Sequence, residues 1–570
     1  MCAIAGIAGG NPQDAERLVA NMLASMKHRG PDHTEVMKVA DDVFLGHNRL
    51  SIIDLQAVAN QPFVSDDGRF TIVFNGEIYN YVELRTTLQP HFTFRTCSDT
   101  EVLLAAYRKW GKNCVERFIG MFAFAIWDNR ENVLFAARDR FGVKPFYFHT
   151  AGNALLFSSE IKALWHAGVH RKPELATWSA FFVYGSYGMP HETFWEDIHQ
   201  LPGGHYLIWQ ADKLVVNRWY FFEDTVKNMQ PALRLLNEEQ ITEQYFALLQ
   251  ESIRLRFRAD VPVGFNVSGG LDSSLLLSLI KKSFPENPTI QAFTFYTGNT
   301  AYDELPWVKE LMNTTLYPLH AVQLKANGVP PLAETVARMQ DEPYGGLPTL
   351  AYATLFKAAR NHNTIVLLDG QGMDEAWAGY DYYQSNSGSI VQGVSSSPLR
   401  PNVLTEDFKK MADSPKYATP FSENLLNLQY RDLFYTKIPR ALRFNDRVSM
   451  TYSTELREPF LDHRLVEMAF ALPVEWKIKD GVGKYLLRKI AHQLLPDTIR
   501  LAPKRPLQTP QREWLSHELI DWAEDCITDF AKQPWVDKKE LMREWDAFKA
   551  GNNDSSFHIW QWINSALLQP

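Results

Sequence analysis

A glycine-rich segment at residues 268–274 (SGGLDSS) constrains the fold of this chain more than any other sequence feature. It follows an apolar run at 261–267 and precedes the helix-like run LLLSLIKK, so a strand, a tight loop and a helix are expected in that order. Glycines let the backbone approach a phosphate closely, and the N–H groups at a helix N-terminus bind anions. The segment therefore predicts a phosphate-binding loop in which Asp272 is a ligand for Mg²⁺. It is not a Walker A loop, and the plain alternative is a Gly-Ser turn.

The rest of the second half of the chain repeats this alternation of strands and helices. A helix is expected over 241–258 and strands over 289–296 and 364–368, which indicates an α/β domain with a parallel sheet and crossover helices. After about residue 420 the pattern is mostly helical. A chain of 570 residues is too long for one hydrophobic core. We therefore expect two domains, at residues 1–220 and 238–570, joined by a linker at 221–237.

The first half of the chain shows a different pattern of short apolar runs broken by turn signals. The runs FTIVFN (70–75), MFAFAIWD (121–128) and VLFAA (133–137) are typical of strands, and the polar residues 129–132 predict a turn between two of them. Helical spacing appears at 15–26 and 100–110. This half is therefore expected to form a layered α+β domain.

Cys2 directly follows the initiator methionine. If Met1 is removed, Cys2 carries both a thiol and a free α-amine, and that amine titrates near pH 8, so it can act as the base for its own thiol. The resulting thiolate is a nucleophile that can attack an amide carbon. The plain alternative is that Cys2 is a small residue opening a buried strand at residues 3–8 (AIAGIA).

Four polar groups elsewhere in this half are candidates for holding an amino-acid amide. The side-chain amide of Asn75 and the backbone N–H of Gly76 can form an oxyanion hole, although an Asn-Gly hairpin turn is the plain alternative. The planar fork of Arg49 can pair with an α-carboxylate. Asp99 can bind an α-ammonium, although Ser98 or Asp99 could instead cap the following helix.

Several motifs of the first half resemble the glutaminase domain of class II, N-terminal-nucleophile amidotransferases. The matching segments are Met1-Cys2 with AIAGI, KHRGPD, HNRLSI, NGEIYN, SDTE, GMFAFAIWD and RDRFGVKP. They cover essentially all of residues 1–200. The resemblance implies an αββα fold, with Cys2 as the nucleophile and with Asn75 and Gly76 as the oxyanion hole. It likewise implies that glutamine is held by Arg49, Glu77 and Asp99.

The segment SGGLDSS resembles the pyrophosphate loop of ATP pyrophosphatases, which activate a substrate as its adenylate and release pyrophosphate. Residues 369–375 (DGQGMDE) resemble the second glycine loop of this family, which implies that Asp374 is the other Mg²⁺ ligand beside Asp272. Without the resemblance, Asp374 could simply cap a helix. The residues implied at the ATP and pyrophosphate site are Asn266, Ser268, Gly269, Gly270, Asp272, Ser273, Ser274, Phe295, Asp369 and Gly370.

A glutaminase joined to such an ATP domain in this order resembles the glutamine-hydrolysing asparagine synthetase family, from residue 1 to about 515. Lys504, in a Pro-rich loop, is expected to stabilise phosphate charge as the adenylate is attacked, although a solvated surface lysine is the plain alternative. One position departs from the family. The second glycine loop commonly reads S-G-E-G or S-G-D-G, and here the neutral Gln371 stands in place of the acid. A neutral amide cannot act as a general base, so Asp369 or another group would bear that role.

The resemblance predicts an ATP-dependent carbon–nitrogen ligase that uses ATP and Mg²⁺. Ammonia released from glutamine at Cys2 would pass through the protein and displace AMP from an acyl-adenylate. Aspartate is the preferred acceptor, giving asparagine, and the first alternative is another carboxylate such as a uronic acid of a surface polysaccharide. A catalytically silent regulatory or binding protein of this fold is a further alternative. A tRNA- or nucleotide-modifying ATP pyrophosphatase ranks last, because its usual extra cysteines or basic surface are absent.

The composition of the chain limits which partners and which cellular compartment are expected. The net charge of -8 argues against a nucleic-acid partner, which would normally need a basic surface. The four cysteines form no C-x-x-C pair, so neither a zinc site nor a disulfide framework is indicated, and a reducing cytoplasmic compartment is expected. No run approaches the roughly 18 apolar residues that span a membrane, so no membrane partner is expected. A homodimer is implied only by the resemblance.

Overall fold

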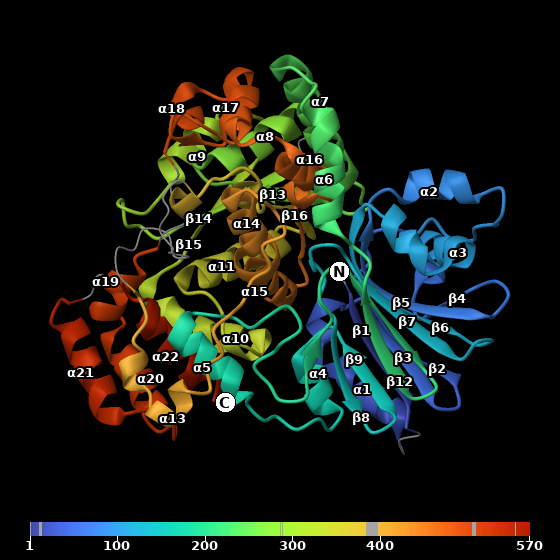
Figure 1. The fold of residues 1–570 in the computed structure, drawn as a ribbon, viewed down its shortest axis with the longest axis horizontal. Coiled ribbons are helices and arrows are strands. Elements are labelled where there is room, and N and C mark those ends of the chain that lie inside the picture. Colours follow the sequence, from blue (N-terminus) through green and yellow to red (C-terminus); the bar gives the residue numbers. More distant parts are fainter. Residues whose placement is uncertain are drawn as a thin grey trace.

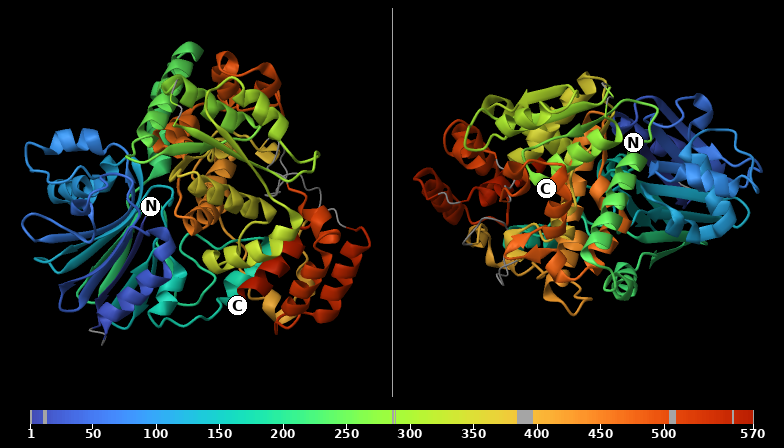
Figure 2. Two further views of the ribbon diagram at one scale, coloured as in Figure 1. Left: turned by 180° about the vertical axis from the view of Figure 1, so that it is seen from behind. Right: turned by 90° about the horizontal axis from the view of Figure 1, so that it is seen from above.

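The computed structural model describes residues 2–10, 14–285, 287, 289–383, 397–503, 509–552 and 555–569. Lys504 lies outside the described residues, so the structure says nothing about its predicted role. Two bodies lie side by side (Figures 1 and 2): an N-terminal body built on antiparallel sheets, coloured blue to teal, and a larger body of sheet and helices, coloured green to red.

The N-terminal domain contains two six-stranded antiparallel sheets. The strand order is β10-β8-β9-β1-β3-β2 in the first sheet and β12-β11-β7-β6-β5-β4 in the second. The strands are β1 (Ala3–Gly9), β2 (His33–Ala40), β3 (Val43–Arg49), β4 (Phe63–Val64), β5 (Phe70–Ile78), β6 (Gly120–Asp128), β7 (Val133–Arg138), β8 (Tyr147–Ala151), β9 (Ala154–Ser158), β10 (His199–Gln200), β11 (His205–Gln210) and β12 (Lys213–Arg218).

These two sheets pack face to face, and helices cover their outer faces. Side chains from both sheets, such as Ile4 and Val73, share the core between them. Helices α1 (Ala15–Ser25) and α4 (Ile161–His166) cover the first sheet, while α2 (Tyr81–Leu88) and α3 (Asp99–Trp110) lie on the side of the second (Figure 1). The predicted αββα layering is confirmed. Because β5 and β6 are covered on both faces, their sequences are continuous apolar runs rather than alternating ones.

The second domain contains a five-stranded parallel sheet, as predicted. Its order is β15-β14-β13-β16-β17, so the direction in which strands are added reverses between β13 and β16. At such a switch point a crevice opens beyond the carboxyl ends of the strands, where ligands bind. The strands are β13 (Val263–Asn266), β14 (Gln291–Tyr296), β15 (Leu319–Gln323), β16 (Val366–Leu368) and β17 (Glu455–Arg457). The main helices around the sheet are α7 (Glu238–Arg256), α8 (Leu271–Ser283), α9 (Leu305–Met312), α10 (Val329–Gln340), α11 (Leu347–Asn361), α15 (Lys437–Thr451) and α16 (His463–Ala471).

Two local expectations differ from the structure. No hairpin turn follows FTIVFN, because β5 continues through Asn75 and Gly76 and stays paired with β6 as far as Ile78 opposite Gly120. The segment 221–237, expected to be a linker, is mostly helix α6 (Phe222–Leu233), which packs against α16. Its polar residues suggested a loop, but the buried side chains of this helix lie on one stripe that α16 covers.

The last part of the chain is helical and buried rather than a free tail. Helices α20 (Ile520–Phe530), α21 (Lys538–Lys549) and α22 (Phe557–Leu568) form the red body in Figure 1. Almost every side chain of α22 is buried, and α22 packs against α20 and α10. The aromatic run FHIWQWI is therefore part of the core. Within the described part of the chain, no helix has both the length and the apolar character needed to cross a membrane.

Candidate active sites

Cys2 is buried at the start of β1, between the ends of β3 and β5. Its main-chain nitrogen donates to the side-chain oxygen of Asn75 (3.1 Å), and its carbonyl oxygen accepts from Nε of Arg29 (3.1 Å). Its Sγ lies 3.9 Å from the carbonyl oxygen of Leu50. Burial raises the pKa of the Cys2 thiol, so the thiol is neutral at pH 7 and needs a base before it can attack. When Met1 is removed, the nitrogen of Cys2 becomes an α-amine that can be this base.

The candidate oxyanion hole lies beside Cys2 on β5. Asn75 is fully buried, and its Nδ2 has no hydrogen-bond partner among the described residues. A buried donor left unpaired costs about 1–3 kcal/mol, so an oxyanion that accepts from it recovers that energy. Gly76 lies so close to β6 that a Cβ atom would be 2.2 Å from the carbonyl oxygen of Met121. No side chain can therefore shield the main chain at this position.

The three predicted glutamine-binding residues are all buried near this strand, with different partners. Arg49 ends β3, and its guanidinium donates to the carbonyl oxygen of Gln56 (2.8 Å) and to Oδ1 of Asn60 (2.6 Å), so it braces the loop at 53–60. Asp99 accepts from the backbone N–H of Ile78 (2.9 Å). Burial raises the pKa of Asp99 to about 6. The cap of helix α3 is instead the preceding serine.

Glu77 faces the second domain. Its Oε1 lies 3.5 Å from a guanidinium nitrogen of Arg457 on β17, and its Oε2 has no hydrogen-bond partner among the described residues. Burial, and then the nearby carboxylate of Glu455, raise the pKa of Glu77 well above its usual value. Its role in holding glutamine stays a prediction, and its position at the domain boundary is an additional finding.

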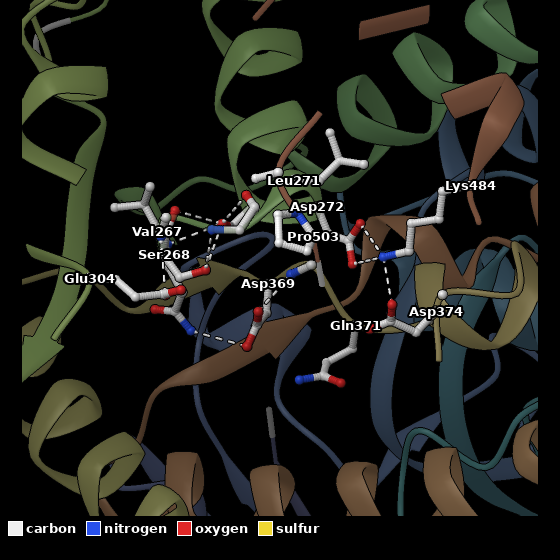
Figure 3. Close-up of a pocket in the computed structure, with 18 of the residues that line it drawn as sticks. Val267, Ser268, Leu271, Asp272, Glu304, Asp369, Gln371, Asp374, Lys484 and Pro503 are labelled. Carbon is white, nitrogen blue, oxygen red and sulfur yellow. Dashed lines mark hydrogen bonds and ion pairs between the residues drawn. The ribbon is translucent and has the colours of Figure 1, made fainter. Parts of the chain in front are cut away.

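The second candidate site is a cavity of about 640 Å³ at the carboxyl ends of β13, β14 and β16 (Figure 3). The glycine-rich loop after β13 and the second glycine loop after β16 form two of its walls. Of the residues predicted at the ATP and metal sites, those that line it are Asn266, Ser268, Gly269, Gly270, Asp272, Ser273, Phe295, Asp369, Gly370 and Asp374. Ser274 lies one step further along α8, where it is fully buried and its N–H donates to the carbonyl oxygen of Gly270 (3.1 Å).

The glycine-rich loop is held in shape by its own serines. The hydroxyls of Ser268 and Ser273 are 2.9 Å apart, and Ser273 donates to the carbonyl oxygen of Ser268 (2.9 Å). The N–H of Gly269 donates to Glu304 (3.2 Å), a carboxylate that sequence reasoning did not single out. Helix α8 starts at Leu271, within this segment, so the helix N-terminus and the glycines before it face the cavity together (Figure 3).

Lys484 is the most informative residue that the sequence did not reveal. Its ammonium lies 2.6 Å from both carboxylate oxygens of Asp272 and 2.6 Å from Oδ1 of Asp374 (Figure 3). A cation thus sits between the two side chains predicted to bind Mg²⁺. Among the described residues no group of three or more His, Cys, Asp or Glu side chains could hold a metal alone. Two carboxylates facing a phosphate-binding loop nevertheless suit Mg²⁺, which takes one or two carboxylates and completes its shell with phosphates and water.

The two sites are joined by buried ion pairs across the domain boundary. The guanidinium of Arg29 donates to the carbonyl oxygen of Cys2. It also forms bidentate hydrogen bonds with the carboxylate of Asp446 on α15 (2.8 and 3.1 Å). The same group donates to Glu160 (2.8 Å). Arg457 on β17 binds Glu455 (2.6 Å) and approaches Glu77 on β5. Charged groups of the second domain therefore reach the immediate surroundings of Cys2.

Comparison with known proteins identifies the family to which this chain belongs, and the two-domain architecture agrees with it. A model described as a glutamine amidotransferase domain matches residues 1–220, and one described as asparagine synthase matches residues 244–569. Those two matches correspond to the two bodies of the fold, except that α5 (Leu175–Tyr184) of the first match packs against α13 (Glu406–Lys409) in the second body (Figure 1). The chain belongs to the asparagine synthase family and is an amidotransferase of asparagine synthase type. The second domain of this family is of the ATP pyrophosphatase kind, which implies the use of ATP.

Relatives differ in their named activities. Glutamine-hydrolysing asparagine synthetase 1 of Bacillus subtilis is 29% identical to this chain, over 98% of this chain and 95% of its own length. A putative glutamine-hydrolysing asparagine synthetase of Methanocaldococcus jannaschii is 32% identical, over 67% and 76% respectively. The amidase chyE of Penicillium rubens is 26% identical, over 85% and 84%.

Proposed function

We propose that this chain is a glutamine-dependent asparagine synthetase. The observation that carries the proposal is the pairing, across one buried boundary, of Cys2 beside an unpaired amide donor with a cavity built on a phosphate-binding loop. The first element suits hydrolysis of an amide, and the second suits activation of an acid by ATP. The four free thiols support the further proposal that the enzyme works in the cytoplasm.

The first reaction is glutamine hydrolysis in the N-terminal domain. The Cys2 thiolate attacks the side-chain amide carbon of glutamine, and the Nδ2 donor of Asn75 stabilises the negative oxygen that develops. Ammonia leaves, and water then hydrolyses the thioester to glutamate. Arg49 and Asp99 are proposed to hold the two charged ends of the glutamine.

The second reaction takes place in the large cavity. The carboxylate of the acceptor attacks the α-phosphorus of ATP, which gives an acyl-adenylate and pyrophosphate. The glycine-rich loop and Lys484 are proposed to bind the leaving phosphates through N–H groups and one positive charge. Asp272 and Asp374 would hold Mg²⁺, which supplies charge neutralisation between the phosphates when bound. Ammonia then displaces AMP.

A second acceptor class is favoured by one specific position. Gln371 lines the cavity at the second glycine loop, where the family resemblance leads us to expect an acid. An amidase is also among the relatives. We therefore propose a sugar acid, such as a uronic acid, as the alternative acceptor. Both acceptors use the same chemistry at the carboxylate.

The test measures pyrophosphate release and amide formation with Mg·ATP and glutamine, with and without aspartate. We expect aspartate-dependent release together with asparagine. Glutamine hydrolysis with neither product would reject aspartate, and galacturonate would be assayed next. A Cys2→Ala variant should lose all glutamine-dependent product while keeping product formation from ammonium chloride. Glutamine hydrolysis that survives this substitution would reject Cys2 as the nucleophile.

A further inference from the structure

The amidation step of the proposed function, on which this inference rests, needs a proton acceptor. When ammonia adds to the carbonyl carbon of the acyl-adenylate, its lone pair forms the C–N bond and its nitrogen becomes positively charged. The C–O bond to AMP then breaks and AMP leaves with that electron pair. The nitrogen must lose one proton to become a neutral amide. A nearby carboxylate that takes this proton typically accelerates the step by about 10²–10⁴-fold.

The two acidic candidates closest to Gln371 in the sequence are poorly suited to this role. Gln371 itself is neutral and faces the cavity (Figure 3). Asp369 already accepts the N–H of Gly370 at one oxygen (2.6 Å) and the amide of Asn266 at the other (3.3 Å). Asp374 contacts the ammonium of Lys484 at the predicted metal position. Glu375 of the same loop also lines the cavity, but it accepts from the Tyr380 hydroxyl (2.7 Å). A proton acceptor from a neighbouring segment would serve this step.

Glu458 reaches this place from the neighbouring strand. In the parallel pair of β16 and β17, Leu368 lies opposite Arg457, so the residues after both strands leave the sheet at the same edge. The backbone N–H of Gln371 donates to the carboxylate of Glu458. The two segments are tightly packed, because a Cβ atom on Gly372 would lie 2.5 Å from Cδ2 of Leu461. Glu458 thus supports the loop that carries Gln371.

The other side of Glu458 faces the glutaminase domain. It lines a small cavity of about 20 Å³, together with Gly120 and Met121 of β6. This volume holds one molecule the size of water or ammonia. In the β5–β6 pair, Met121 and Gly120 lie opposite Glu77 and Ile78, two and three residues beyond Asn75. Glu458 therefore stands between the strand of the candidate oxyanion hole and the second glycine loop.

The free oxygen and the surroundings of Glu458 suit proton transfer. Only 4% of the residue is exposed, and its Oε2 has no hydrogen-bond partner among the described residues. Burial is the main cause that raises the pKa of Glu458, and the nearby carboxylate of Asp369 raises it further. The positive charges of Lys144 and Arg256 and the N–H of Gln371 lower this pKa. A carboxylate with a raised pKa is a stronger base than an exposed one.

We propose that Glu458 is the general base of amide formation and supplies the carboxylate that position 371 lacks. It accepts the proton from the ammonia nitrogen, directly or through one water, as the C–N bond forms. The proton later passes to water, which restores the carboxylate. Gln371 lines the large cavity and Glu458 lines the small cavity beside it, so in this scheme the proton is accepted from the side that faces the glutaminase domain.

The test uses the full-length enzyme, ATP and ammonium chloride, with aspartate as acceptor, or galacturonate if aspartate gives no product. Glu458→Gln keeps the shape of the side chain and its acceptor oxygen for the Gln371 N–H. We expect amide formation to fall about 10²–10³-fold. Glutamine hydrolysis and the exchange of labelled pyrophosphate into ATP, which report the two earlier reactions, should stay within about threefold. A loss of all three activities in equal measure would overturn the proposal.

Two further variants separate base catalysis from a structural role. In Gln371→Glu/Glu458→Gln the carboxylate returns at the other position, and we expect at least a tenfold recovery of amide formation. Glu467→Gln is the matched control, because Glu467 is also buried beside the N-terminal domain and accepts from Tyr220 (2.8 Å) but lines neither cavity. It should not change amide formation. Absence of recovery in a double variant that still hydrolyses glutamine like the parent enzyme would reject Glu458 as the base.

A pH profile provides the last readout. The rate of amide formation, divided by the concentration of unprotonated ammonia, should fall on the acid side as Glu458 becomes protonated. Glu458→Gln should remove this acid limb. An unchanged acid limb in the variant would show that another group accepts the proton. If the unmodified enzyme activates no carboxylate at all, the proposed function is rejected. This result differs from a rejection of Glu458 as the base, which requires a parent enzyme that forms the amide.

Discussion

The amide of Asn75 is the residue-scale feature on which the glutaminase assignment depends most. Its Oδ1 accepts from the nitrogen of Cys2, while its Nδ2 is buried and has no partner among the described residues. Removing this donor by Asn75→Ala should lower kcat for glutamine hydrolysis about 10²–10³-fold with little change in KM, because the hydrogen bond forms mainly in the transition state. Asn113→Ala, at an exposed position, is the control. A kcat within threefold of the parent enzyme would contradict the assignment.

Asp99 makes a pH-dependent prediction at the same scale. Burial raises its pKa to about 6, so the carboxylate loses its charge as the pH falls through this value. If Asp99 binds the α-ammonium of glutamine, only the charged form binds well. We expect kcat/KM for glutamine hydrolysis to decrease below about pH 6, since this ratio reports the free enzyme. Steady-state kinetics between pH 5 and pH 8 would check this. A kcat/KM that is flat down to pH 5 would exclude Asp99 from charge pairing.

At the scale of elements, the sequence predicts the strands and helices whose pattern lies within one short segment of the chain. The strand, loop and helix around residues 263–283 follow from an apolar run, glycines and a helical repeat, all within one short segment. Strand β17 was not predicted, because Glu-Leu-Arg has two charged residues and no apolar run. Its charges are buried only because Arg457 pairs with Glu455 and meets Glu77 of the other domain. This pairing of buried charges depends on contacts between segments that are distant in the sequence, so a local sequence pattern cannot predict it.

In the candidate sites, too, some residues are predicted from a local sequence pattern and others only from the fold. Cys2 and the glycine-rich loop are marked by their own neighbours in the sequence. Lys484 is more than 200 positions from Asp272 and more than 100 from Asp374, and only the fold brings them together. Its one local signal is that it follows the hairpin of β18 (Ile478–Lys479) and β19 (Val482–Gly483). The role of Glu458 likewise appears only when β16 and β17 are paired.

The β18–β19 hairpin yields a prediction about the ATP site. It delivers the Lys484 ammonium to Asp272 and Asp374, and charged hydrogen bonds of this kind contribute about 1.5–3 kcal/mol each. Lys484→Met should lower ATP-dependent pyrophosphate release by roughly 10–100-fold. Lys479→Met, in the same hairpin but exposed, should have no such effect. Glutamine hydrolysis serves as the internal reference. Equal pyrophosphate release in the two variants would mean that Lys484 neutralises the two carboxylates and does not bind the phosphates.

At the scale of the whole molecule, the two domains meet through charges rather than through an apolar face alone. Arg29 of the first domain binds Asp446 of the second with two hydrogen bonds, and both groups are buried. Breaking a buried ion pair by removing one partner costs more than the pair contributes, because the other charge remains buried. The boundary therefore holds Arg29 in one position only while the second domain is in place. Since Arg29 also donates to the carbonyl of Cys2, the nucleophile is positioned by both domains.

This arrangement predicts that a change in the second domain alters the chemistry of the first. Asp446→Ala should destabilise the protein by about 3–5 kcal/mol and lower kcat/KM for glutamine hydrolysis, because Arg29 loses its main partner and shifts relative to Cys2. Denaturant unfolding and glutaminase kinetics at 25 °C would measure the two effects. Asp407→Ala, with an almost fully exposed carboxylate in the same domain, is the control and should change neither. If Asp446→Ala is destabilised but hydrolyses glutamine with the parent kinetic constants, Glu160 alone suffices to orient Arg29, and the domains are coupled for stability without being coupled for catalysis.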